Sequence, residues 1–256
     1  MSEPVYRHEY KYTVTQAECE MLKNRLGQVM IPDPYAVDGQ YVIRSLYFDD
    51  AWDRCMEENE AGVDRREKYR IRIYDAGSDV IHLEIKEKCS GLTRKTSCDL
   101  SEEECLQLMD GTMPLSLDGR APLNRLQMQM RCVRMEPKVI IAYERTAFVH
   151  PSGNVRITFD RNIMASGRRE EFLEDRVSGM VPVLPTGMHV LEVKYDEFLP
   201  DFIAQLLETG SEEYRKEDLQ QIIANCSQVP PPPSSASPFT SSCARVRLIS
   251  SLARML

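Results

Sequence analysis

Apolar and charged positions alternate strictly along residues 68–73. The even positions hold the cations Lys68, Arg70 and Arg72, and the odd positions are apolar or aromatic. A period of two is typical of a β-strand, whose successive side chains point to opposite faces. The sequence therefore predicts a strand over about 65–75. Its cations lie about 7 Å apart on one face and repel, so either water or a polyanion should offset their charge.

The same alternation recurs along the chain. It predicts further strands at 6–12, 41–49, 80–88, 93–99, 139–148, 155–160 and 190–195. Turn-forming residues at 75–79 and at Gly153-Asn154 join neighbouring strands as hairpins. About eight strands result, joined mostly by hairpins or by single helices, and no internal repeat is visible.

Helix signals separate some of these strands. Thr15, with Glu18 three residues later, forms a capping-box pattern and starts a helix that ends near Gly27. Ser101 starts a second helix, on which Leu106 is expected to face the core. The pattern predicts further helices at 121–134, 200–209 and 214–225.

The remaining segments show no regular helix or strand pattern. Residues 50–62 are acidic, with room for a short helical turn, and their Trp52 is expected to pack against the domain. Residues 162–187 are predicted to form a long loop. We expect one domain over 1–228, because the Pro- and Ser-rich tail of 229–256 cannot form a packed core.

Composition limits the classes of function. The chain has 256 residues, of which 42% are hydrophobic and 28% charged, enough to bury a core of ordinary globular type. Its formal net charge of −8 argues against a protein that coats nucleic acid, since such proteins are usually basic. A local basic cavity is not excluded, because nearby charges set the local field.

Cysteine usage indicates a reducing compartment. None of the eight cysteines forms a CxxC pair, and no charged-then-apolar signal peptide opens the chain. We therefore expect a cytoplasmic protein with reduced thiols. No apolar run approaches the roughly 18 residues of a membrane span. An association with a membrane protein, or a membrane-surface contact of a weakly amphipathic stretch in the tail, stays open. The sequence gives no indication of oligomeric state.

Several familiar site motifs are absent. The sequence has no P-loop pattern GxxxxGKS/T and no dinucleotide-binding GxGxxG pattern. Its four histidines lack the HExxH spacing of a zinc site, and we interpret them as structural or surface residues. Any chemistry must therefore come from another set of side chains.

Ionic strand faces are the strongest candidate for that set. They carry Arg7, Glu9 and Lys11; Lys68, Arg70 and Arg72; Glu84 and Lys86; Arg145; Arg156 and Asp160; Glu192 and Lys194. For one strand alone, a solvent-facing surface is the simpler explanation. Repetition favours a barrel with the ionic faces inside, wide enough for a ligand, and with the apolar faces covered by helices. Arginine suits phosphate, and a few carboxylates among the cations would hold a divalent metal.

Six short motifs carry a resemblance to a known family. They are Arg7-x-Glu9-Tyr10-Lys11-Tyr12, Ser45-Leu46-Tyr47-Phe48-Asp49, Arg70-Ile71-Arg72-x-Tyr74, Leu83-Glu84-x-Lys86, Tyr143-x-Arg145-x-Ala147-Phe148 and Leu191-Glu192-Val193-Lys194. With these motifs in this order, residues 3–225 resemble the VTC domain. That domain is the polyphosphate polymerase module of the vacuolar transporter chaperone complex and its bacterial relatives. It is grouped with CYTH phosphatases and fungal-type RNA triphosphatases as a triphosphate tunnel metalloenzyme.

The resemblance implies a fold and a site. The fold is α+β, an eight-stranded antiparallel β-barrel (the triphosphate tunnel) with helices packed on its outside. The catalytic tunnel cations would be Lys11, Arg70, Arg72, Lys86, Arg145 and Arg156. Further substrate-binding cations would be Lys68, Lys95, Lys194 and Lys216. Glu192, with Glu9 as the second candidate, would hold Mn²⁺ or Mg²⁺.

Two positions depart from the family pattern. The wider superfamily opens with Glu-x-Glu-x-Lys, but Arg7 replaces the first Glu here. Loss of one metal-binding carboxylate disfavours a hydrolytic scheme with two metals. A late Ser-Lys-Tyr motif has only Arg215-Lys216-Glu217 as its counterpart, and a solvent-facing helix explains Lys216 equally well.

The resemblance implies a polyphosphate polymerase that uses ATP, a divalent metal and a polyphosphate acceptor, without nucleic acid. Two other functions stay open, a tunnel hydrolase of triphosphate or nucleoside triphosphates and a non-catalytic polyphosphate-binding module. No side-chain nucleophile is needed, because phosphoryl transfer is mostly positioning and charge neutralisation.

Overall fold

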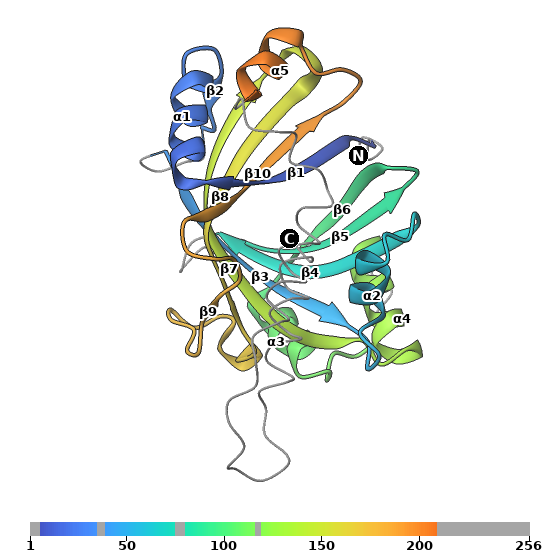
Figure 1. Cartoon of the computed structure of the whole chain (residues 1–256). Coiled ribbons are helices and arrows are strands. Elements are labelled where there is room, and N and C mark those ends of the chain that lie inside the picture. The colour runs from blue at the N-terminus through green and yellow to red at the C-terminus, as the bar shows by residue number, and fades with distance from the viewer. Residues whose placement is uncertain (1–5, 35–38, 75–79, 116–118, 209–256) are drawn as a thin grey trace, which may run out of the picture.

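The computed structural model describes residues 6–34, 39–74, 80–115 and 119–208 (Figure 1). The strands are β1 (His8–Thr15), β2 (Ile31–Pro32), β3 (Tyr41–Asp49), β4 (Arg66–Tyr74), β5 (Ile81–Cys89), β6 (Leu92–Leu100), β7 (Glu136–His150), β8 (Val155–Ser166), β9 (Val181–Pro182) and β10 (Met188–Tyr195). The helices are α1 (Gln16–Leu26), α2 (Arg54–Glu60), α3 (Glu102–Met109), α4 (Ala121–Cys132) and α5 (Asp201–Leu207), with 3₁₀ turns η1 (Ser152–Asn154) and η2 (Arg169–Glu171). The helix predicted at 214–225 and the tail of 229–256 lie outside the described residues.

Eight strands form one antiparallel sheet in the order β1-β10-β8-β7-β3-β4-β5-β6. The sheet curls strongly, so that its two edge strands approach each other (Figure 1). They meet where Arg7 and Thr93 exchange two backbone hydrogen bonds of 2.9 Å. The short strands β2 and β9 pair with β7 and β8. The prediction of an α+β fold with an eight-stranded antiparallel β-barrel is confirmed, in the form of one strongly curled sheet.

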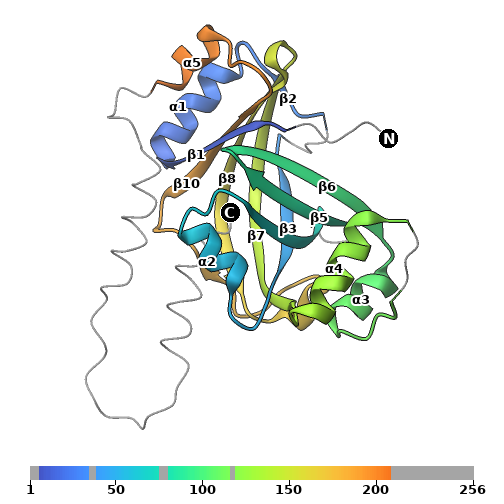
Figure 2. The same ribbon diagram turned by 90° about the vertical axis from the view of Figure 1, so that its right-hand side faces the viewer.

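Helices cover the outer face of the sheet in two groups (Figure 2). Ile71 of β4 packs in one apolar cluster with Leu108 of α3 and residues of α4. Leu22 of α1 and Ile203 of α5 pack in a second cluster with Ile157 of β8. Each such aliphatic side chain stabilises the fold by about 1.5–3 kcal/mol when fully buried. Within the described parts of the chain, no helix has the length and apolar character needed to cross a membrane.

The predicted helix starts are confirmed, one of them with a different buried face. Thr15 and Glu18 form the reciprocal capping box at the start of α1. Ser101 caps α3 in the same way. The prediction for Leu106 is wrong, since it is 45% exposed while Leu108 is fully buried. The short helix turns its Cys105 and Leu108 side to the sheet.

The prediction of a long loop at 162–187 is also wrong in part. Strand β8 continues to Ser166, because it keeps pairing with β7 across a bulge where the register shifts between Ala142 and Glu144. Asn162 adopts a left-handed φ of 51° at this point. Such an irregularity interrupts the side-chain alternation that reveals a strand. The rest of the segment contributes η2 and β9.

Residues 50–62 contain the helix α2, which the carboxylate of Asp49 holds in place. Its two oxygens accept the backbone N–H groups of Cys55 and Met56, both at 2.9 Å. Asp49 thereby satisfies first-turn donors that Asp53, the residue before the helix, leaves without a side-chain cap. Trp52 is 83% exposed, so the prediction that it packs is wrong.

Apolar side chains fill part of the barrel interior, which corrects the expectation that every apolar face turns outward. Ile141 lies directly opposite Ser45, and both side chains are fully buried. The apolar inner wall consists of Tyr41, Ile43, Tyr47, Val139, Ile141, Tyr143, Ile163, Ala165, Val183, Leu184 and Val190. Three successive apolar residues, Val139 to Ile141, bury both faces of β7 here.

Candidate functional site

The inner face of β4 carries Lys68, Arg70 and Arg72, as the alternation predicts. Arg70 lies between Glu84 of β5 and Tyr47 of β3, its direct partners on the two neighbouring strands. One oxygen of Glu84 accepts from Arg70 Nε at 2.8 Å and lies 2.7 Å from its Nη2. Arg70 Nη1 donates to the Tyr47 hydroxyl at 2.9 Å. Partners on both sides therefore fix this guanidinium.

Arg72, the next cation on this face, is held in the same way. Its Nε donates to Ser45 Oγ at 3.1 Å, and its Nη2 donates to the Tyr143 hydroxyl at 3.0 Å. Its Nη1 lies 3.6 Å from Glu84. Only 5% of Arg72 is exposed, so its charge faces the interior rather than bulk water.

Glu84 is the carboxylate that these cations share. It is 1% exposed, and Lys95 of β6 donates to its second oxygen at 2.7 Å. Burial opposes ionisation of Glu84, but Arg70, Arg72 and Lys95 outweigh it and hold the pKa well below its usual range. Glu84 is therefore an ionised anchor that gathers three cations.

A second anchor lies on β8. Asp160 accepts two hydrogen bonds of 2.6 Å from Arg145, one to each oxygen. The guanidinium of Arg145 also stands 5.2 Å from the centre of the Tyr143 ring and 3.6 Å from Glu192. This paired fork geometry fixes Arg145 as firmly as Glu84 fixes Arg70.

Two glutamates and two lysines meet on β1 and β10. Glu192 lies 2.7 Å from Lys194 Nζ and 3.3 Å from Lys11 Nζ. Lys11 Nζ is also 3.8 Å from Glu9, so its ammonium group lies between the two carboxylates. Burial opposes ionisation of Glu192, but the neighbouring cations outweigh it and hold the pKa well below its usual range.

Glu9 and Glu192, the two carboxylates predicted as metal ligands, both lie within 4 Å of Lys11 Nζ. The pKa of each is lowered, against the effect of burial, so both are anionic. Glu84 and Asp160 are each already held by an arginine. The described residues contain no group of three or more His, Cys, Asp or Glu that would hold a metal alone. Two carboxylates nonetheless suit Mg²⁺ or Mn²⁺ when substrate phosphates and water complete the coordination.

Three lysines lie directly opposite one another on β4, β5 and β6. This lysine row consists of Lys68, Lys86 and Lys95. Like charges in such positions repel. Burial lowers the pKa of Lys86 to about 7, although Glu9 pairs with it. Burial and the nearby Lys11 and Lys86 lower the pKa of Lys68 well below its usual range. The row therefore favours an added anion.

Arg156 lies at the edge of the ionic interior, opposite Lys194. It pairs with Asp33 and donates to the Tyr41 hydroxyl at 2.9 Å. Its side chain is 31% exposed, which leaves it open to solvent on one side.

Arg7 has a structural role where the two edges of the sheet meet. Its Nε lies 2.6 Å from Asp196, without the alignment of a hydrogen bond, and its Nη2 donates to the carbonyl of Asn154. Its backbone forms the bridge to Thr93 that joins the edges of the sheet. Arg7 therefore holds the seam of the barrel.

Among the described residues, nine of the ten predicted cations lie on the inner face of the curled sheet. They are Lys11, Lys68, Arg70, Arg72, Lys86, Lys95, Arg145, Arg156 and Lys194. The tenth, Lys216, lies outside the described residues. The described carboxylates that face these cations are Glu9, Asp33, Glu84, Asp160 and Glu192. Basic side chains thus outnumber these carboxylates by four, and a bound polyanion would favour the charged forms of Lys68 and Lys86, whose pKa values are lowered in the free protein.

The sequence pattern places Glu84 and Asp160 on the inward ionic faces but does not predict that each of them holds an arginine. The hydroxyls of Tyr47 and Tyr143 lie inside quoted motifs. Asp33 precedes a proline outside any long strand, and no pattern singles it out.

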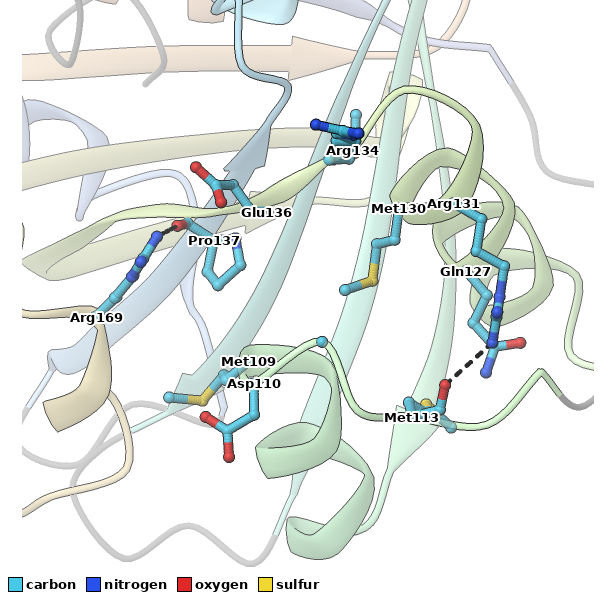
Figure 3. Close-up of a pocket in the computed structure, with 12 residues that line it drawn as sticks. Met109, Asp110, Met113, Gln127, Met130, Arg131, Arg134, Glu136, Pro137 and Arg169 are labelled. Atoms are coloured by element: carbon cyan, nitrogen blue, oxygen red, sulfur yellow. Dashed lines mark hydrogen bonds between the residues drawn. The ribbon is translucent and has the colours of Figure 1, made fainter.

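A separate cavity lies on the outside of the barrel, between α3, α4 and the start of β7 (Figure 3). It measures about 350 Å³, and its lining includes Met109, Met130 and Arg131. Arg131 already donates to the carbonyl of Met113 at 3.3 Å. None of the nine tunnel cations lines this cavity, so it is not part of the ionic site.

The family model of the VTC domain matches residues 6–216. A search of curated proteins finds no significant match.

Solved structures with a similar fold have low sequence identity. A candidate adenylate cyclase from Bacillus halodurans is 14% identical, with a TM-score of 0.46, over 95% of this chain and 98% of that one. A candidate adenylyl cyclase from Hippeastrum, described as having a dominant triphosphatase activity, is 13% identical, with a TM-score of 0.47, over 94% and 95%. An inorganic triphosphatase is 13% identical, with a TM-score of 0.28, over 77% and 80%. At these scores the structural similarities carry no functional argument.

Proposed function

The chain belongs to the VTC domain family, and on that premise we propose that it is a polyphosphate polymerase. It would transfer the γ-phosphoryl group of ATP to the end of a polyphosphate chain. The observation that carries the proposal is the interior in which nine cations surround five carboxylates. Four of those cations are arginines, whose forked donors suit phosphate oxygens.

The proposed reaction needs no covalent enzyme intermediate. A terminal phosphate oxygen of the acceptor chain attacks the γ-phosphorus of ATP and forms a new P–O–P bond. The bond between the γ-phosphorus and the β-bridging oxygen breaks, and ADP leaves with its electron pair. The chain grows by one phosphate for each ADP released. Positioning and neutralisation of the negative charge are the main tasks of the protein in such a transfer.

Fixed cations support this scheme. Arg70, Arg72 and Arg145 are held by Glu84 and Asp160 before any ligand arrives. Preorganised donors of this kind stabilise a developing charge without a reorganisation cost during the reaction. The side chains would hold the triphosphate and the acceptor end in line.

The apolar inner wall supports transfer to phosphate rather than to water. Arg72 and Arg145 are 5% and 7% exposed, and Tyr143, a member of that wall, contacts both. A site that admits little water lowers the competition from hydrolysis of the donor.

A divalent metal, Mn²⁺ or Mg²⁺, would be held by Glu192, with Glu9 as the second ligand. When bound, it would neutralise charge on the phosphate oxygens and help to orient them. Lys11, which contacts both carboxylates, would then turn to phosphate.

Incubation with ATP and Mn²⁺ tests the proposal against its two alternatives. A long phosphate polymer together with ADP supports the polymerase. Orthophosphate without polymer would instead identify a tunnel hydrolase, and tight binding of tripolyphosphate without turnover would identify a binding module. As a user of ATP, the polymerase would face the cytoplasm.

Binding of tripolyphosphate should take up protons. Since the pKa of Lys86 lies at about 7 in the free protein, part of this amine is neutral at higher pH. An adjacent phosphate favours the charged form and raises the pKa, so affinity should fall as pH rises above about 7. Calorimetry at about pH 8 in two buffers of different ionisation enthalpy should show the uptake.

Two variants make this measurement specific. Lys86→Arg keeps the charge at all pH values and should reduce the proton uptake. Lys194→Arg, at a lysine already 2.7 Å from Glu192, is the matched control and should leave the uptake unchanged. Equal heats in both buffers for the unmodified protein would refute the prediction.

A further inference from the structure

Three rings lie together on the inner face of the barrel. The ring centres of Tyr41 and Tyr74 are 6.0 Å apart, and those of Tyr74 and His82 are also 6.0 Å apart. They come from β3, β4 and β5, which are neighbours in the sheet. We call Tyr41, Tyr74 and His82 the ring group.

The ring group borders the tunnel arginines directly. Tyr41 is the cross-strand partner of Arg145, and His82 is the partner of Arg72. Tyr74 lies two residues beyond Arg72 on the same strand, and therefore on the same face. Each ring is thus adjacent to a cation that the phosphates of a substrate would contact.

The inner faces of β4 and β5 run from cations to rings. Along β4 the inward positions are Lys68, Arg70, Arg72 and then Tyr74. The strand β5 runs antiparallel beside it, so that Lys86 lies opposite Lys68 at one end and His82 lies opposite Arg72 at the other. Successive inward positions are about 7 Å apart. The interior therefore has a lysine end and an aromatic end.

Tyr74 and His82 keep part of their surfaces open. Both are half-buried, whereas Tyr47 and Tyr143 on the inner face are 1% and 3% exposed. The hydroxyls of Tyr47 and Tyr143 are also engaged by arginines. His82 Nδ1 lies 2.7 Å from Asp99, which fixes the orientation of its ring. Among the described inward-facing aromatic side chains, Tyr74 and His82 are therefore the ones available to a ligand.

We propose that Tyr74 and His82, the two open members of the ring group, bind the nucleoside of ATP and so set the direction of the substrate in the tunnel. The base would stack on Tyr74, and the triphosphate would run past Arg72 and Arg145 toward the lysine row. The acceptor chain would then enter from the lysine end. This inference rests on the proposed function, because it assigns an orientation to the same substrate. Stacking suits any base, so the group would favour nucleotides over inorganic phosphates without strict base selectivity.

Comparison of ATP with inorganic tripolyphosphate tests the inference by calorimetry. Tyr74→Leu should weaken ATP binding roughly tenfold, as expected for loss of one base–aromatic stack. Binding of tripolyphosphate, which has no base, should stay unchanged. Tyr74→Phe keeps the ring and should bind both ligands as the unmodified protein does. Tyr195→Leu is the matched control, because Tyr195 stacks with His8 and Tyr10 on the opposite parity of its strand.

The possible results distinguish a failure of the nucleoside site from a failure of the proposed polymerase function. Equal weakening of both ligands, or no change in either, would overturn the role of Tyr74. No binding of tripolyphosphate to the unmodified protein would overturn the proposed function together with the inference.

A photoreactive azido derivative of ATP, modified on the base, gives a test without any variant. Labelling near Tyr74 or His82 supports the proposed direction, and labelling near Lys68 or Lys86 contradicts it.

Discussion

Replacement of Arg70 and Arg72 by alanine should lower the affinity for tripolyphosphate by at least about a hundredfold. Both guanidiniums are held in place before the ligand binds, and each would form charge-assisted hydrogen bonds with phosphate oxygens. Such bonds are worth about 1.5–3 kcal/mol each, so loss of two removes roughly 3–6 kcal/mol of binding free energy. Calorimetric titration with tripolyphosphate measures the change.

The variant needs a companion change because Glu84 would lose two of its three cationic partners. A buried carboxylate left without its partners destabilises a protein by about 3–5 kcal/mol. Glu84→Gln in the same chain removes that charge and preserves the shape. The matched control is Arg94→Ala with Arg125→Ala, since both of these arginines pair with Glu87 on the other face of β5. Comparable loss of affinity in the control would show that the binding site lies elsewhere.

Replacement of Glu192 by glutamine should separate binding from turnover. Glu192 lies within 3.6 Å of Lys11, Arg145 and Lys194, so removal of its charge leaves those cations freer to attract phosphate. Without metal, tripolyphosphate should bind at least as tightly as before. Metal-dependent polymer synthesis should fall by at least about a hundredfold, because the proposed metal loses its main ligand.

Glu87→Gln is the matched control for the effects of Glu192→Gln on tripolyphosphate binding and on polymer synthesis. Glu87 is also a strand glutamate paired with two cations, but it has the parity opposite to Glu84 and Lys86. Its replacement should change neither binding nor synthesis. If Glu192→Gln retains full metal-dependent synthesis, Glu192 does not hold the metal. If it also weakens tripolyphosphate binding, its charge is needed to organise the cations.

Alternation along the sequence locates the eight long strands and their ionic faces, but not β2, β9 or the end of β8. Arg70 and Arg72 were recognisable because parity alone places them on one side of β4. Parity could not reveal that Glu84 lies between those two arginines, since that contact depends on the register of β4 against β5. Parity could not reveal the lysine row either, because its three members come from three strands and meet only through their register.

Irregular backbone and apolar runs account for the errors. The bulge in β7 and β8 shifts the register, and the pattern beyond residue 160 no longer alternates. Ile43 and Ile141 face the interior next to the cations, although their sequence pattern resembles that of an outer, helix-covered face. Asp33 reaches Arg156 from the short strand β2 and its following loop, which only the tertiary fold brings close.

Quantitative phosphorus NMR of the protein with ATP, Mg²⁺ and a short polyphosphate primer tests the central claim most directly. The spectrum distinguishes internal polyphosphate residues, ADP and orthophosphate in one sample. Polymerase activity predicts that each ADP formed is matched by one added internal phosphate, while orthophosphate stays at its starting level. Orthophosphate that rises in step with ADP, without new internal residues, would contradict the account.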